Sequence, residues 1–175
     1  MDAAATSLSI SIPRIATPRL LLRELRARDF DAFAENLADP EATKFLSSVS
    51  DRRGAWRIFS SCAGSWVLHG KGWWAVELRE TGDVVGTVGA FIREGAPDLE
   101  LGWSLYRRFW GHGYATEAAR AALELSFDGY HASRVVAHIS SGNTASVQVS
   151  QRIGMKYEAE VDFYGEPIGR YALEH

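Results

Sequence analysis

One glycine-containing segment limits what this chain can fold into more than any other part of the sequence. Residues 107–118 read RRFWGHGYATEA, follow a stretch with strand-like alternation and open a stretch with helical spacing. The first turn of a helix has about four unpaired backbone N–H groups and carries the positive end of the helix dipole. Gly111 and Gly113 let these groups approach a ligand without Cβ obstruction, and Arg108 adds a positive charge. The segment therefore predicts an anion site, most naturally for phosphate or pyrophosphate.

Two familiar phosphate-binding motifs do not fit this segment. A P-loop needs Gly-Lys-Ser/Thr after four spacer residues, which the segment lacks. A dinucleotide fingerprint needs a third small residue five positions after Gly111 and a parallel βαβ unit near the N-terminus. That position is Thr116, and the segment lies two thirds along the chain, after strands that look antiparallel. Neither nucleotide-binding class is expected.

Length and composition favour one globular domain and exclude several function classes. The chain has 175 residues, 46% hydrophobic and 23% charged, which is close to the globular average. Its net charge of -3 gives no sign of a nucleic-acid partner. One cysteine and five histidines without ligand spacing predict neither a disulfide framework nor a metal site. Without an apolar run of about 18 residues or a secretory signal, we expect no membrane span and a cytoplasmic location.

Hydrophobic periodicity predicts a mixed α/β (α+β) domain with helices packed on one sheet. In chain order we expect a strand at 20–25, helices at 29–39 and from 51, strands at 74–78, 84–92 and 99–105, a helix at 115–128, a strand at 134–140, a helix at 143–153, and strands at 157–164 and 168–173. Residues 1–16 are expected to form a flexible arm and residues 17–173 the domain. Residues 173–175 are either native or the start of a vector-derived histidine tag.

The glycine segment resembles the acyl-CoA pyrophosphate loop of the GNAT superfamily of acetyltransferases. The family pattern Arg/Gln-x-x-Gly-x-Gly/Ala is matched by Arg108, Gly111 and Gly113. Four further motifs are similar to the branch of ribosomal-protein N-terminal acetyltransferases: TPRLLLR at 17–23, ELGW at 100–103, Asn143-x-x-Ser146, and RIGM at 152–155. The resemblance covers about residues 17–173, with the elements in the family's order.

The resemblance implies a mostly antiparallel sheet of about seven strands, flanked by four helices and splayed between the fourth and fifth strands. It also implies acetyl-CoA as co-substrate, without a metal. Backbone groups of the fourth strand, 99–105, would hold the pantetheine arm and polarise the thioester carbonyl. The implied acetyl-CoA-binding residues are Trp103, Ser104, Leu105, Arg108, Gly111, His112, Gly113, Tyr114, Ala115, Asn143 and Ser146. Asn143 is also expected to cap a helix by accepting the Ser146 N–H, and this structural role is the simpler interpretation.

Glu100 and Ser150 are the candidate catalytic residues. Glu100 alternates away from the apolar face of its strand, where family members often carry an acidic residue, and would act as general base. It could equally form an ordinary surface ion pair. Ser150 occupies the position at which many family members carry a tyrosine that protonates the departing thiolate. A serine hydroxyl is a poorer acid, and the thiolate can also take its proton from water.

Two further residues are candidates for substrate contact. His138 alternates with the apolar residues of its strand and would face the acceptor side, although a lone strand histidine is more often a half-buried structural residue. Trp74 begins a strand beside the expected acceptor cleft, although core packing would explain it as well.

Three functional hypotheses remain open from the sequence. The first is transfer of acetyl to a protein N-terminal α-amine, whose pKa of about 8 leaves it partly neutral near physiological pH. The second is acetylation of a small amine such as a polyamine, amino acid or antibiotic. The third is an acyl-CoA-binding regulatory module without turnover. The partners would be acetyl-CoA and the amine, with no nucleic acid and no membrane, in a monomer or homodimer.

Overall fold

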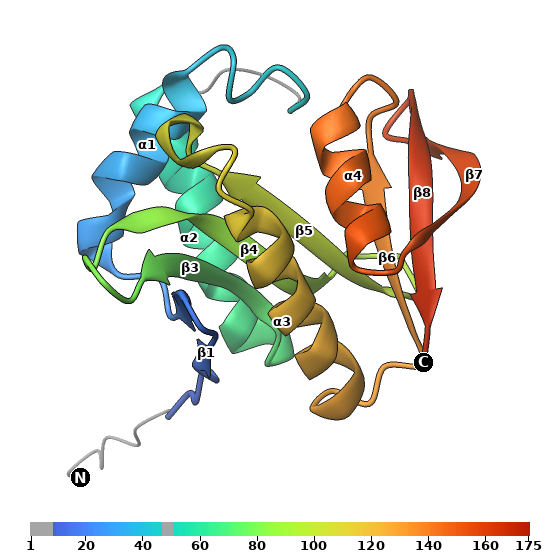
Figure 1. Ribbon diagram of the computed structural model, residues 1–175, viewed down its shortest axis with the longest axis horizontal. Helices are drawn as coiled ribbons and strands as arrows, with labels where there is room; N and C mark the ends of the chain where they lie inside the picture. Colours follow the sequence, from blue (N-terminus) through green and yellow to red (C-terminus); the bar gives the residue numbers. More distant parts are fainter. Residues whose placement is uncertain (1–8, 47–50) are drawn as a thin grey trace, which may run out of the picture.

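An eight-stranded mixed sheet organises residues 9–46 and 51–175, which this computed structural model describes (Figure 1). Its strands lie in the order β1-β2-β3-β4-β5-β6-β8-β7. They are β1 (Ile15–Ala16), β2 (Leu20–Arg23), β3 (Gly72–Leu78), β4 (Val84–Ile92), β5 (Leu99–Leu105), β6 (Arg134–Ile139), β7 (Lys156–Phe163) and β8 (Glu166–Glu174). All neighbours pair antiparallel except β5 and β6, which are parallel. The predicted mixed α/β class is confirmed.

Four α-helices cover the two faces of the sheet. They are α1 (Phe30–Ala38), α2 (Arg52–His69), α3 (Tyr114–Asp128) and α4 (Thr144–Arg152). Helix α3 packs on β4 and β5, with α4 beside it on β6, whereas α1 packs on α2 and α2 packs on β3 (Figure 1). The predicted apolar face of α1 is buried, and Asp51 caps α2 by accepting the Gly54 N–H at 2.7 Å.

The parallel pair of β5 and β6 separates almost as soon as it forms. Only Leu99↔Val135 and Glu100↔Val136 are paired, although β5 continues to Leu105 and β6 to Ile139. These are the fourth and fifth of the strands predicted from the sequence, so the expected splay is present. In the chain as labelled here they are fifth and sixth, because β1 precedes them.

The ends of the sheet differ from the sequence prediction. Ile15 and Ala16, at the end of the predicted arm, form the additional strand β1 against β2. At the other end, Leu173 and Glu174 belong to β8 and pair with β6. The sheet therefore extends one residue beyond the predicted last strand and includes the last two residues of the predicted arm.

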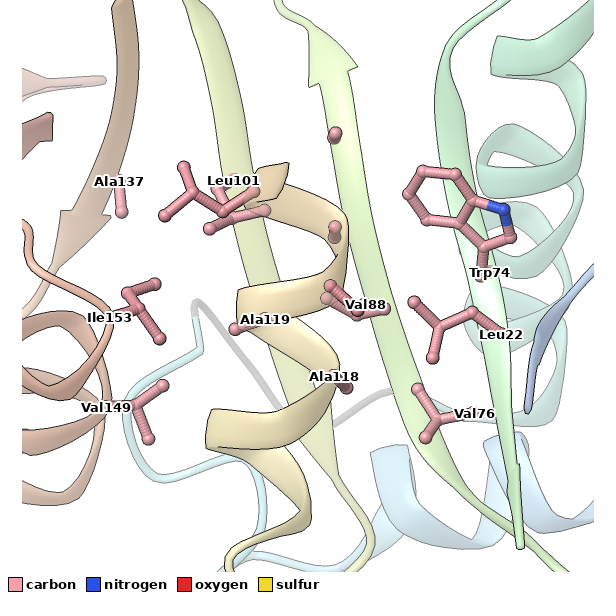
Figure 2. Packing of buried hydrophobic residues seen from close by; sticks show 14 of the residues in the cluster. Leu22, Trp74, Val76, Val88, Leu101, Ala118, Ala119, Ala137, Val149 and Ile153 are labelled. Atoms are coloured by element: carbon pink, nitrogen blue, oxygen red, sulfur yellow. The ribbon is translucent and has the colours of Figure 1, made fainter. Parts of the chain in front are cut away.

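The main core lies between the sheet and α3. Figure 2 shows Leu22, Trp74, Val76, Val88 and Leu101 of the sheet around Ala118 and Ala119 of α3. Val149 of α4 and Ile153, the residue that follows α4, lie beside them. Alanines on the inner side of α3 let the helix axis approach the strands closely, and the two in this group are fully buried. This close approach brings the start of α3 to the end of β5 at which the strands have separated.

On the opposite face of the sheet, one indole covers two glycines. Trp73 of β3 lies beside Gly89 of β4, and Gly89 lies beside Gly102 of β5. A Cβ atom at Gly89 would come within 2.5 Å of the Trp73 ring, and one at Gly102 within 2.7 Å. Trp73 also stacks on Phe91, with 5.0 Å between ring centroids. The two glycines are therefore required by the space that the indole occupies.

A buried ion-pair network joins β2 to the turn that precedes α1. The Arg23 side chain is 1% exposed, and its guanidinium contacts Asp29 at 2.7 Å and Glu77 at 2.6 Å. Hydrogen bonds to Asp29 raise the pKa of Arg23, against the opposing effect of burial. Removing one partner of such a pair leaves a buried charge poorly compensated.

We expect Asp29→Asn to lower the free energy of unfolding by about 3 kcal/mol, since Arg23 would keep only Glu77 as a charged partner. Urea unfolding followed by circular dichroism measures this change. Asp31→Asn is the matched control, because Asp31 pairs with Arg52 at the surface with its side chain 75% exposed and should change stability by less than about 1 kcal/mol. Equal effects of the two variants would contradict the buried network.

Candidate active site

A cavity of about 610 Å³ lies beside the part of β5 that has separated from β6. One wall is the end of β5, a second is the loop that leads into α3, and a third is α4. Residues of the segment between α1 and α2 close it on the remaining side. The volume falls within the range of about 300–1,000 Å³ that is typical of small-molecule sites.

The loop before α3 holds two glycines in left-handed conformation. Gly111 has φ 81° and Gly113 has φ 77°, and Gly113 is the N-cap residue of the helix. A Cβ atom at Gly111 would meet nothing within 4 Å, so backbone conformation rather than space requires glycine there. The first helical hydrogen bond runs from Glu117 N to Gly113 O, which leaves the N–H groups of residues 114–116 without a helical acceptor.

The backbone of β5 also presents polar groups toward the cavity side. Tyr106 N donates to Val85 O of β4 at 2.8 Å. Because backbone groups of a strand point alternately to its two neighbours, Trp103 and Leu105 turn theirs to the side from which β6 has separated. The Trp110 indole N–H, in the loop before α3, donates to Leu105 O at 2.7 Å. It satisfies a carbonyl that would otherwise bond to a neighbouring strand.

Nine of the eleven residues predicted to bind acetyl-CoA line this cavity. They are Trp103, Ser104, Leu105, Gly111, Gly113, Tyr114, Ala115, Asn143 and Ser146. Asn143 also has its predicted cap role, because its Oδ1 accepts the Ser146 N–H at 3.1 Å. The structure thus brings together three segments that are separate in the sequence.

Arg108 and His112 do not line the cavity. The Arg108 guanidinium lies 4.7 Å from the centroid of the neighbouring Phe109 ring and borders a separate hollow beside α1. The His112 ring stacks on Tyr114, with 5.4 Å between centroids, and its Nδ1 lies 2.8 Å from Trp110 O. The side chains of Arg108 and His112 therefore contact other parts of the protein and not the cavity.

Glu100 is buried in an ion pair on the sheet face opposite α3. It is 5% exposed, and its carboxylate contacts the Arg93 guanidinium through two bonds of 2.7 and 2.8 Å. Burial raises the pKa of Glu100, but His138 and Arg93 lower it more, so the pKa lies below its ordinary value. A carboxylate held in this way is a weak base, and Glu100 does not line the cavity.

His138 lies beside Glu100, two residues beyond the last pair between β5 and β6. Its Nδ1 is 3.4 Å from Glu100 Oε1 and has no hydrogen-bond partner among the described residues. The imidazole packs 4.9 Å from the Phe163 ring of β7. Val135, Ala137 and Ile139 belong to the main core, so the strand alternation puts His138 on the opposite face of the sheet.

The structure corrects two predicted site residues. Trp74 is fully buried in the main core and its indole N–H donates to Pro13 O at 2.8 Å, so it cannot contact a substrate. The neighbouring Trp73 faces the other side of the sheet because strand side chains alternate. Ser150 is also fully buried, and its hydroxyl donates to Val147 O at 2.8 Å. It does not line the cavity and is not positioned to protonate a thiolate.

Several further residues line the cavity; of these, the sequence suggested only Trp110, either near the cofactor or packed beneath the loop. Phe45, Leu46 and Lys44 come from the segment between α1 and α2, and Trp110 and Arg152 come from the loop and α4. The exposed fractions of Phe45, Leu46 and Trp110 are between 39% and 47%, which is high for large apolar side chains. Lys44, Phe45 and Leu46 lie in no motif of the sequence. Trp110 lies within the glycine segment and Arg152 begins the RIGM motif, so only these two offered a signal.

Residues 9–46 and 51–175 contain no group of three or more His, Cys, Asp or Glu side chains that could hold a metal ion. Within the same ranges, no helix combines the length and the apolar composition needed to cross a bilayer.

Comparison with known proteins assigns the class. The family model for an acetyltransferase (GNAT) domain matches residues 19–156. A protein of Bacillus subtilis (strain 168), named YkkB and uncharacterised, is 31% identical over 161 residues, which are 90% of this chain and 94% of that protein. The chain therefore belongs to the GNAT family of acetyltransferases.

Solved structures show the same architecture. An acetyltransferase from Agrobacterium tumefaciens superposes with a TM-score of 0.86 at 31% identity, covering 98% of this chain and 100% of that one. A ribosomal L7/L12 alpha-N-protein acetyltransferase in complex with coenzyme A superposes with a TM-score of 0.75 at 17% identity, covering 93% and 98% of the chains. At that identity the second likeness shows the fold alone.

We expect Gly111→Ala to lower the free energy of unfolding by about 1 kcal/mol, because an L-residue is strained at the left-handed φ of this position. Gly64→Ala should act with the opposite sign and a similar size, since Gly64 lies inside α2 with open space around it. Urea unfolding midpoints at unchanged m-value measure both changes. A neutral or stabilising Gly111→Ala would mean that the loop does not hold this conformation.

Proposed function

We propose that this protein transfers an acetyl group from acetyl-CoA to a primary amine, and that the physiological acceptor is a protein N-terminal α-amine. The observation that carries the proposal is the cavity itself, where the open backbone of β5 and the free first turn of α3 lie on one surface. One group of N–H donors suits a thioester carbonyl, and the other suits a pyrophosphate.

The residues around the cavity fit the parts of acetyl-CoA. The amides of residues 111–116 would bind the pyrophosphate, with the dipole of the 15-residue helix α3 behind them. The backbone of Trp103 and Leu105 would bind the pantetheine amides, and Phe45 and Leu46 would cover the apolar part of the arm. Acetyl-CoA, when bound, supplies the thioester whose carbonyl carbon the amine attacks.

We propose that His138 receives the proton of the attacking amine and that Glu100 orients His138. Glu100 is engaged by Arg93, and its lowered pKa makes it a poorer proton acceptor than a free carboxylate. Its Oε1 nevertheless lies 3.4 Å from His138 Nδ1, where it can fix the ring and stabilise the imidazolium. With Ser150 buried, the departing thiolate would take its proton from water.

The charges around His138 favour an α-amine over a polyamine. A polyamine site needs unpaired carboxylates, but Glu100 is already paired with Arg93. On β8, Arg170 opposes His138 and is paired with Glu158. An α-amine needs less help to become neutral than a lysine, because its ordinary pKa is about 8 rather than about 10.4.

Isothermal titration with coenzyme A tests the cofactor assignment. We expect saturable binding to the wild type and none to a Gly111→Val/Gly113→Val variant, because side chains at these φ values would distort the loop. Gly82→Val is the matched control: Gly82 has φ 77° in the turn between β3 and β4, with open space around it. It should lose similar stability per site and keep its affinity. If the wild type does not bind coenzyme A, the proposed function is wrong.

A thiol-release assay with acetyl-CoA then identifies the acceptor class. The panel consists of peptides that begin with Ser, Ala or Met, spermidine, free amino acids and an aminoglycoside. We expect turnover with at least one peptide. The same peptide with a blocked N-terminus should give no turnover. Turnover with spermidine or an aminoglycoside alone would replace the proposed acceptor, and binding without any turnover would favour a regulatory acyl-CoA-binding role.

With the accepted amine, His138→Asn should lower kcat by about a hundredfold and Glu100→Gln by less, while coenzyme A affinity stays unchanged. Neither residue lines the cofactor cavity, so an affinity change would point to misfolding. Ser150→Ala is the control, since its hydroxyl bonds only Val147 O, and kcat should stay within about twofold. A larger loss for Glu100→Gln than for His138→Asn would make Glu100 the base itself.

A further inference from the structure

Two sequence motifs that lie about 100 residues apart meet beside the cofactor loop, and catalysis as proposed above uses neither of them. One is the segment Thr17-Pro18-Arg19, which leads into β2. The other is Glu117, in the first turn of α3. Their contacts connect the N-terminal edge of the sheet to the loop that precedes α3.

The Glu117 carboxylate accepts three hydrogen bonds from this segment. Thr17 Oγ1 donates to Oε1 at 2.6 Å, Arg19 N donates to Oε1 at 3.0 Å, and Arg19 Nε donates to Oε2 at 2.6 Å. The Glu117 side chain is 16% exposed, so the ion pair is partly shielded from water. Burial raises the pKa of Glu117, and the bonds from Thr17 and Arg19 lower it further than burial raises it.

The Arg19 guanidinium also contacts the loop directly. Its Nη1 donates to His112 O at 2.9 Å, and its Cζ lies 4.7 Å from the centroid of the Tyr114 ring. One side chain thus joins a loop carbonyl, the first residue of α3 and, through Glu117, the first turn of the helix. Charge-assisted bonds of this kind fix geometry more strongly than neutral ones.

The orientation of the His112–Gly113 peptide follows from this contact. In a planar trans peptide the C=O and the following N–H point in opposite directions. His112 O faces Arg19, which does not line the cavity, so the Gly113 N–H points away from Arg19. In the Trp110–Gly111 peptide, two residues earlier, Trp110 O lies 2.8 Å from His112 Nδ1, and the Gly111 N–H points the opposite way.

We propose that Arg19 is a positioning residue for the cofactor loop. Together with Glu117 it holds the His112–Gly113 peptide so that the Gly113 N–H is aimed at the ligand before any ligand arrives. The segment is itself anchored to the sheet, because Arg79 Nη1 donates to Thr17 O at 2.7 Å and Arg79 N donates to Arg19 O at 3.0 Å. The contacts of Arg79 with Thr17 and Arg19 therefore fix the conformation of the cofactor loop from the sheet, without a bound ligand.

The first test measures loop order in the ligand-free protein and does not require that coenzyme A binds. We expect the ¹⁵N heteronuclear NOE of the Gly113 amide to fall clearly in Arg19→Ala and in Glu117→Gln. Arg14→Ala is the matched control, since Arg14 pairs with Glu24 in the same N-terminal region and does not contact the loop. An unchanged NOE in both loop variants would overturn the proposal. If Arg19→Ala does not fold, Glu117→Gln alone decides.

The second test measures affinity, and it rests on the proposed function. Coenzyme A should bind Arg19→Ala about tenfold more weakly than the wild type, and Arg14→Ala with unchanged affinity. Arg19→Lys should not restore the affinity, because an ammonium group cannot contact Glu117 and His112 O in the planar geometry of a guanidinium. Equal affinity of wild type and Arg19→Ala would overturn the positioning role. Absence of wild-type binding would overturn the proposed function only, and the NOE would still judge the positioning role.

Discussion

The separation of β5 from β6 is the constraint on which the rest of the molecule depends. A strand that leaves its neighbour after two residue pairs exposes N–H and C=O groups that would otherwise be paired. The protein satisfies one of them with an indole, at Leu105 O, and leaves the others facing a cavity. Closing the sheet would satisfy these groups internally and would also remove the wall that the proposed co-substrate needs.

The order of the elements and the loop before α3 could be predicted from the sequence, for physical reasons. Alternation in 99–105 and helical spacing after residue 114 are local signals, and the structure has these elements within a few residues. Residue type alone predicts the left-handed backbone at Gly111 and Gly113. It also predicts the helix cap at Asn143. The short strand β1 was missed because two residues carry no periodicity, and pairing with β2 defines it.

Side-chain direction and pairing were harder to predict than the elements. Trp73 and Trp74 are adjacent and equally apolar, so only the register of β3 decides which one enters the core. Ser150 was placed by analogy with a tyrosine position, but burial of its helix face turns the hydroxyl to Val147 O. Glu100 was placed on the right face, yet its partner Arg93 lies beyond the end of β4, and no spacing rule connects them.

The indole of Trp73 has a consequence for how sequences of this fold can vary. It occupies the room that side chains at 89 and 102 would need, and these three positions lie in a row across three strands. A smaller residue at 73 would leave unfilled space above the backbone of Gly89 and Gly102. A larger residue at either glycine would clash with the Trp73 indole. Relatives should therefore exchange bulk among these positions in a correlated way, with one large side chain shared by the row.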